Sequence, residues 1–132
     1  MKDIKFRAWD IAAKKMRVVT QLFFEDGDLT QVNTKTSGWL NAKDEVVLVQ
    51  FTGLTDKNGK EIYEGDIVRG GELEGDHGSV VYEIAYNEGG DYPAFDLKGW
   101  RGETNGICFF INDAYIEVIG NIYENPELLD TN

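Results

Sequence analysis

The chain has 132 residues, of which 42% are hydrophobic and 28% are charged, so it can bury a core and is not disordered overall. Thirteen Lys and Arg against 24 Asp and Glu give a net charge of −11, which argues against general affinity for nucleic acid or anionic lipid. One Cys and one His exclude a disulfide framework, a Cys-rich zinc site and most catalytic triads. No apolar segment has the length of a membrane helix, and residues 1–30 lack a signal-peptide core. We therefore expect a soluble, cytoplasmic protein.

The charge is unevenly distributed along the chain. Residues 1–22 carry six Lys and Arg against two acids, a net charge of +4, and residues 23–132 carry −15. Such a division favours attraction within one chain or between two chains. Alternatively, these cations are simply the solvent-facing residues of a hairpin, which needs no partner.

The start of the chain predicts three antiparallel strands. Apolar residues alternate along 4–9 and again along 16–22, which is the period of a strand, and residues 10–15 join the two segments. The pair Asp26-Gly27 supplies the positive φ of a tight turn and leads into a returning strand at 29–34.

Residues 35–45 are polar and irregular, so they predict a boundary between an N-terminal β-hairpin region, 1–44, and a body, 45–132, which can also pack as one domain. The boundary segment is too short and too aromatic for a flexible linker. We therefore expect Trp39 to be packed.

The body predicts a series of short strands separated by turns. Asn58-Gly59 is the strongest hairpin signal, and Asn125-Pro126 predicts a single helical turn. Strands are expected at 45–54, 60–63, 67–69, 79–86, 92–97, 107–111 and 115–123. This spacing is typical of a mainly β protein with minimal helix, and the strands from residue 66 onward predict a small SH3-like β-barrel.

Three separated segments carry a family resemblance. They are Gln50–Val68 (QFTGLTDKNGKEIYEGDIV), Ile4–Asp10 (IKFRAWD) and Ile116–Leu129 (IEVIGNIYENPELL). In this order they resemble the YopX family of phage and prophage proteins. The resemblance implies a mainly β protein of the bacterial host cytoplasm, without an assigned activity and without catalytic residues to transfer.

The residues of this signature have a structural interpretation. Glycines permit bends that a Cβ would oppose, and Asp side chains accept backbone N–H groups across their own turns. Ile62 and Ile67 are expected to face inward. The structural signature comprises Thr52, Gly53, Asp56, Gly59, Ile62, Tyr63, Glu64, Gly65, Asp66, Gly120, Asn121, Tyr123 and Pro126.

Catalytic and metal sites find little support. Glu72, Glu74, Asp76 and His77 could hold a divalent cation, but their glycine-rich segment is more typical of a solvated hairpin tip. Cys108 lies in an apolar run without a nearby base, which predicts a buried small hydrophobic residue. We expect neither a cofactor nor a metal, and no enzymatic activity.

A row of aromatic residues is the remaining candidate site. Tyr82 and Tyr86 share a strand face, and Tyr92, Phe95 and Trp100 follow. Such a row is most often core, but it could also line a groove for a peptide. The acidic surroundings of such a groove would favour a basic peptide or protein over nucleic acid.

Three functions follow in order of preference. The first is a non-enzymatic protein-interaction module whose partner is a host protein, a phage protein or a second copy, with the aromatic row as candidate binding residues. The second is an acidic decoy that imitates nucleic acid, suggested by the −15 of residues 23–132. The third is weak nucleic-acid binding through Lys5, Arg7 and Trp9. Unprotected sheet edges and the uneven charge also make a homo-oligomer plausible.

Overall fold

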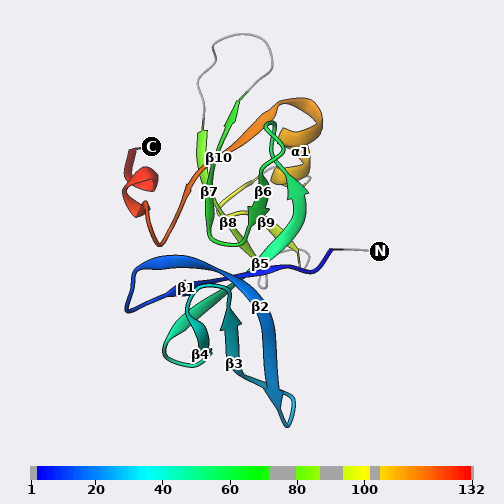
Figure 1. The fold of residues 1–132 in the computed structure, drawn as a ribbon. Coiled ribbons are helices and arrows are strands. Elements are labelled where there is room, and N and C mark those ends of the chain that lie inside the picture. Colours follow the sequence, from blue (N-terminus) through cyan, green and yellow to red (C-terminus); the bar gives the residue numbers. More distant parts are fainter. Residues whose placement is uncertain (1–2, 72–79, 87–93, 102–104, 132) are drawn as a thin grey trace. The chain divides into compact units, whose positions relative to one another are not determined.

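The computed structural model describes residues 3–71, 80–86, 94–101 and 105–131 (Figure 1). The chain separates into two compact units, Met1–Phe51 and Thr52–Asn132, here called unit 1 and unit 2. The boundary expected near residue 44 precedes this division. The division falls later because strand β5, Val46–Thr55, begins in unit 1 and ends in unit 2, so the units meet within this strand and not in the segment before it.

The fold is mainly β, as predicted, and consists of two antiparallel sheets. The first has the strand order β4-β3-β2-β1-β5-β6 and the second the order β10-β7-β8-β9. The other strands are β1 (Phe6–Asp10), β2 (Lys15–Glu25), β3 (Asp28–Thr34), β4 (Gly38–Asn41), β6 (Glu61–Tyr63), β7 (Asp66–Gly71), β8 (Val80–Tyr86), β9 (Phe95–Leu97) and β10 (Tyr115–Asn121). The described strands form no closed barrel, so the predicted SH3-like barrel is replaced by two open sheets.

In unit 1 the core cluster lies on one face of the sheet, and Val49 and Phe51 of β5 are buried on the other face. β1 pairs with β2 on one side and with β5 on the other, and Ala8, Val32 and Val46 form the buried centre. Because side chains alternate along a strand, the residues between these core positions point to the opposite face. Leu40 packs on the core, and its neighbour Trp39 is 47% exposed. The expectation that Trp39 is packed is therefore wrong.

In unit 2 the sheet and helix α1 (Gly106–Asp113) enclose a larger core. Ile62 and Ile67 are fully buried, which confirms that both face inward. The ring of Phe110 approaches the β7 backbone so closely that a Cβ on Gly70 would lie 2.8 Å from it. The core cluster comprises Ile62, Val68, Ile84, Leu97, Ile107, Phe110, Ala114 and Ile116.

Helix α1 replaces the strand that the sequence predicted at 107–111. Asn105 caps the helix, since its side-chain oxygen accepts the backbone N–H groups of Ile107 and Cys108. The side-chain amide of Asn105 also donates to the carbonyl of Phe95, and the N–H of Gly106 donates to the Asp96 carboxylate. These contacts with β9 outweigh the β-propensity of the apolar run.

The same helix changes the interpretation of Cys108. Ile107 and Phe110 point into the core, whereas Cys108 lies on the outer side of α1 and is exposed. The prediction that Cys108 is buried, made from its place in an apolar run, is wrong because only one face of the helix packs on the core.

The C-terminal segment agrees with its prediction in kind. After Asn125, residues Pro126–Thr131 form the 3-10 helix η1. Within the described part of the chain, no helix has the length and apolar character needed to cross a membrane.

Candidate functional site

The turn between β5 and β6 is organised around Asp56, which is 7% exposed. One carboxylate oxygen accepts the N–H groups of Asn58 at 2.8 Å and Lys60 at 2.9 Å. The other accepts the N–H of Val118 in β10 at 2.9 Å. Gly59, with φ +80°, completes the turn in a conformation that favours glycine. Asp56 thus closes its own turn and fastens it to β10.

The electrostatics of Asp56 follow from this geometry. Burial acts to raise the pKa of its carboxyl group, but the backbone N–H groups of Val118, Lys60 and Asn58 together outweigh burial. The pKa is therefore lowered below the ordinary value of 3.8. A carboxylate held in this way is ionised near neutral pH and has little capacity left for a ligand.

The other polar residues of the signature also bind the backbone of the chain. The Thr52 hydroxyl donates to the carbonyl of Ile62, Asp66 accepts the N–H of Tyr63, and Asn121 accepts the N–H groups of Tyr123 and Glu124. These contacts hold the bends of the sheet in place. Tyr63 is buried, and Glu64, Tyr123 and Pro126 lie at or beside turns.

Tyr123 packs against the turn between β6 and β7. A Cβ on Gly65 would lie 3.0 Å from the Tyr123 ring, and one on Gly120 would lie 2.6 Å from Asn125. Burial, together with the carboxylates of Glu64 and Glu83, raises the pKa of Tyr123 above 10.0. The glycines Gly65 and Gly120 of the signature therefore permit close packing. Gly53 acts differently, because its φ of +89° is a backbone conformation that favours glycine.

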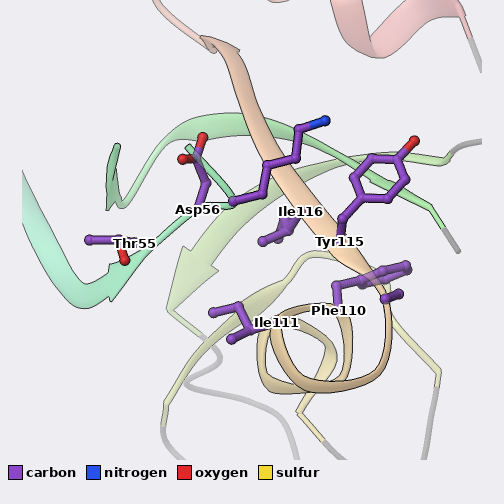
Figure 2. Close-up of a pocket in the computed structure, with 8 residues that line it drawn as sticks. Thr55, Asp56, Phe110, Ile111, Tyr115 and Ile116 are labelled. Atoms are coloured by element: carbon purple, nitrogen blue, oxygen red, sulfur yellow. The ribbon is translucent and has the colours of Figure 1, made fainter. Parts of the chain in front are cut away.

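A cleft of about 280 Å³ lies between the Asp56 turn, which joins β5 to β6, and α1. Figure 2 shows Thr55 and Asp56 on the left, Ile111 and Phe110 of α1 below, Ile116 in the middle and Tyr115 on the right. The Lys57 ammonium lies 4.6 Å from the centroid of the Tyr115 ring and 3.4 Å from a Glu117 carboxylate oxygen. We call this the α1 cleft; its lining is Thr55, Asp56, Lys57, Phe110, Ile111, Ala114, Tyr115 and Ile116.

Part of the predicted aromatic row gathers beside α1. The rings of Tyr82 and Trp100 lie edge to face with centroids 6.0 Å apart, and Trp100 lies 5.6 Å from both Phe109 and Phe110. Tyr82 and Trp100 are half-buried and pack against the core of unit 2. The sequence reasoning missed the contribution of Phe109, for which the capping residue Asn105 was the available signal.

Tyr86 is placed differently from Tyr82. It is 43% exposed and packs edge to face on Phe95, with centroids 5.4 Å apart. Tyr92, also predicted to belong to the row, lies outside the described residues. The row is thus partly packed on the core and partly exposed at β8.

The basic candidates of the N-terminal region share one face of the unit 1 sheet. Register pairs Arg7 with Val18 and Val49, and Trp9 with Met16 and Val47. Lys5 lies on the same side, with its ammonium 5.5 Å from the Phe51 ring centroid. The same face continues through β3 and β4, where Asn33 pairs with Trp39. The side-chain amide of Asn33 donates a hydrogen bond to the side-chain oxygen of Gln21. We call it the outer face; it includes Lys5, Arg7, Trp9, Met16, Val18, Phe23, Trp39 and Val47.

The sequence reasoning placed Lys5, Arg7 and Trp9 together but missed Val18, Trp39 and Val47. Strand alternation shows which side a residue faces within its own strand. It does not show which strands are neighbours, so the extent of the face depended on the pairing. Opposed residues of antiparallel strands lie on the same side of the sheet, and the register therefore defines the surface.

Comparisons with known proteins bear on this geometry. A family model described as YopX protein matches residues 5–130. The chain belongs to the YopX family. The crystal structure of protein EF1440 from Enterococcus faecalis is similar to this chain at 31% sequence identity and a TM-score of 0.72, covering 98% of this chain and 99% of that one. No curated protein matches the sequence.

The YopX signature Gln50–Val68 corresponds to the end of β5, the Asp56 turn, β6 and the start of β7. Among the described residues of this YopX-family chain, no three His, Cys, Asp or Glu side chains are grouped as metal ligands would be. Glu72, Glu74, Asp76 and His77, which were weighed as cation ligands against a solvated hairpin tip, lie outside the described residues.

Proposed function

We propose that this YopX-family chain is a phage- or prophage-encoded protein-interaction module without enzymatic activity, and that the outer face of unit 1 is its main binding surface. The observation that carries the proposal is the exposure of large apolar side chains on this face. Val18 is 55% exposed, and Phe23 and Trp39 are each 47% exposed. An antiparallel sheet face that meets only water is usually polar.

These residues are not required by the core of their own unit. The core cluster of unit 1 forms on the opposite side of the sheet, around Ala8, Val32 and Val46, and the residues buried on the outer face are Val49 and Phe51 of β5. Apolar side chains that do not stabilise the fold gain free energy when a partner removes them from water. The outer face therefore has the composition of a docking surface.

The charge of unit 1 indicates the kind of partner. Unit 1 has eight Lys and Arg against seven Asp and Glu, a net charge of +1, in a chain whose total charge is −11. Lys5 and Arg7 lie on the outer face beside the apolar residues. A matching protein surface would be apolar at its centre and would carry carboxylates toward its rim.

The test compares two exposed aromatic residues on opposite faces. Trp39 lies on the outer face, and Phe24, which is 56% exposed, pairs with Leu29 beyond a register shift and lies on the core side. A photo-crosslinking amino acid is placed at position 39 or at position 24 in cells, and crosslinked proteins are identified by mass. The proposal expects one identified protein to crosslink from position 39 only.

The identified protein is then purified and its affinity for the chain is measured. Trp39→Ser is expected to weaken binding at least tenfold, which corresponds to about 1.4 kcal/mol, and Phe24→Ser is expected to leave binding unchanged. Equal crosslinking from both positions, or equal affinity of both variants, would overturn the proposal.

A second candidate is single-stranded nucleic acid. Trp9 and Trp39 could stack bases while Lys5 and Arg7 contact phosphates, as on other sheet surfaces that bind single strands. The net charge of −11 opposes this function. Fluorescence anisotropy of a labelled oligonucleotide at low salt separates the two. Saturable binding that Trp39→Ser abolishes and that salt weakens would favour nucleic acid over protein.

A further inference from the structure

We infer that unit 2 carries a second binding site, the α1 cleft, which accepts one large apolar side chain from a basic segment of a partner protein. This site is independent of the outer face of unit 1. It rests on three properties of unit 2: the size and lining of the cleft, the outward side of α1, and the charge.

The lining of the cleft suits a hydrocarbon side chain. Phe110 and Ile111 of α1 and Ile116 of β10 form an apolar wall (Figure 2), to which Ala114, the C-cap of α1, also contributes. The volume of about 280 Å³ is at the lower limit of small-molecule sites. A cleft of this size has room for one side chain and not for an extended ligand.

The two charged residues of the cleft lining are already engaged. The Asp56 carboxylate accepts three backbone N–H groups, and Lys57 pairs with Glu117 and stacks on Tyr115. A ligand that depended on a new ionic bond within the cleft would have to displace these contacts. An apolar side chain needs none of them, and burying it favours binding.

The outward side of α1 extends the apolar surface beyond the cleft. Ile111, which lines the cleft, is 38% exposed, and Phe109 is 39% exposed. A helix that covers a core and otherwise faces water normally has polar residues on its outer side. The outward Cys108, Phe109 and Ile111 instead provide a rim against which the backbone of a bound segment could pack.

The charge of unit 2 selects the partner. Unit 2 has five Lys and Arg against seventeen Asp and Glu, a net charge of −12. The negative electrostatic potential that this net charge produces attracts basic segments and repels acidic ones. The chemistry that fits is therefore a short segment with one Leu, Phe or Met flanked by Lys or Arg.

The test uses three acetylated peptide amides of sequence Lys-Lys-Leu-Lys, Lys-Lys-Ser-Lys and Glu-Glu-Leu-Glu, titrated into the full chain. Binding is followed by the backbone NMR signals of Ile111, Ala114 and Tyr115 and by the alkylation rate of Cys108, the one cysteine of the chain. The first peptide is expected to shift these signals and to slow alkylation. The other two are expected to bind at least tenfold more weakly.

Matched variants place the site. Ile111→Ser removes an apolar side chain from the rim and is expected to weaken binding of the Lys-Lys-Leu-Lys peptide at least fivefold. Val80→Ser, which changes a 41% exposed residue of the same unit that does not line the cleft, is expected to have no effect. Both residues are partly exposed, so both variants should fold, and their NMR spectra verify this.

Three outcomes would overturn the inference. Equal binding of the serine peptide would mean that charge alone drives association, and equal binding of the acidic peptide would remove the role of charge. Sedimentation that shows a dimer dissociated by Ile111→Ser would make a second copy the occupant. Trp39→Ser should change none of these results, so failure here and failure of the outer-face proposal are distinguishable.

Discussion

The two units solve the same packing problem differently. Each has an antiparallel sheet with a buried core on one face, but on its other face unit 1 leaves large apolar side chains such as Val18, Phe23 and Trp39 exposed, whereas unit 2 adds a helix and an aromatic cluster. Most exposed large apolar residues of unit 1 lie on strands, with Ile4 and Ile11 just outside them, and α1 carries two of those in unit 2, Phe109 and Ile111. The charge differs as well, from +1 in unit 1 to −12 in unit 2.

This difference separates residues that hold the fold from residues available to a partner. In unit 2, Asp56 and Gly70 are in tight contacts that the fold needs. In unit 1, Trp39 and Val18 lie outside the core. Substitutions at the first pair should therefore change stability, and substitutions at the second pair should change binding only.

The largest effect is expected for Asp56→Ala. It leaves the N–H groups of Asn58, Lys60 and Val118 without their acceptor, and bonds to a charged group are worth about 1.5–3 kcal/mol each. We expect the free energy of unfolding to fall by about 3 kcal/mol or more, measured by urea denaturation. Asp44→Ala, at an exposed turn of unit 1, is the control. A loss below about 1 kcal/mol would contradict the anchoring role of Asp56.

Gly70→Ala is expected to cost about 2 kcal/mol, because the new methyl group would lie 2.8 Å from the Phe110 ring. The same measurement in a Phe110→Leu background tests the cause. If the ring is responsible, the alanine should cost less in that background than in the parent chain. Equal costs in both backgrounds would mean that the methyl group is opposed by something other than Phe110.

Acid is expected to destabilise both units, because protonation of Asp10 or Asp56 weakens the hydrogen bonds that the carboxylate accepts. The loss of stability should be smaller than for Asp56→Ala, since protonation leaves the side chain in place. In unit 1 the Ala13 N–H and the Arg17 guanidinium hold the pKa of Asp10 below 3.8, and burial opposes them. The pKa of Asp56 is likewise lowered. Their stabilising contributions are complete well above pH 3.8 and are lost as the pH falls through 3.8 towards the folded-state pKa values.

Urea denaturation between about pH 6 and about pH 3 checks this pH dependence. Asp56→Asn and Asp10→Asn should each lose less stability over this range than the parent chain does. A variant whose free energy of unfolding falls as steeply as that of the parent would show that its carboxylate is not the titrating group.

The smallest effect is expected for Trp39→Ser, which should change the free energy of unfolding by less than about 0.5 kcal/mol because the side chain is outside the core. Its counterpart in unit 2 is Trp100→Ser, which removes a ring that packs on Phe109 and Phe110 and should cost about 2 kcal/mol. Thermal denaturation of both variants tests the comparison. Similar losses would mean that Trp39 supports the fold, and the outer face would lose its interpretation as a spare surface.

Local patterns were sufficient for much of the fold. Asn58-Gly59 marked the turn between β5 and β6, and Asn125-Pro126 marked the start of η1. Both predictions succeeded because the deciding interactions span only a few residues. The inward position of Ile62 and Ile67 followed in the same way from the strand period.

The wrong predictions concern residues whose secondary structure or exposure depends on partners far away in the sequence. The segment Ile107–Ile111 has the β-propensity of a strand, but its first N–H groups are capped by Asn105 and by Asp96 of β9, so it forms a helix. Trp39 resembled a core residue by type, but pairing of β3 with β4 placed it on the outer face.

The mainly β character, the turns, the family and the uneven charge could all be read from the order of the residues, because each depends on neighbouring residues or on composition. The folded chain was needed to establish that Asp56 accepts the N–H of Val118, that α1 forms, and that Lys5, Arg7 and Trp9 share a face with Trp39. These contacts join residues far apart in the chain, and no local pattern encodes which strands become neighbours.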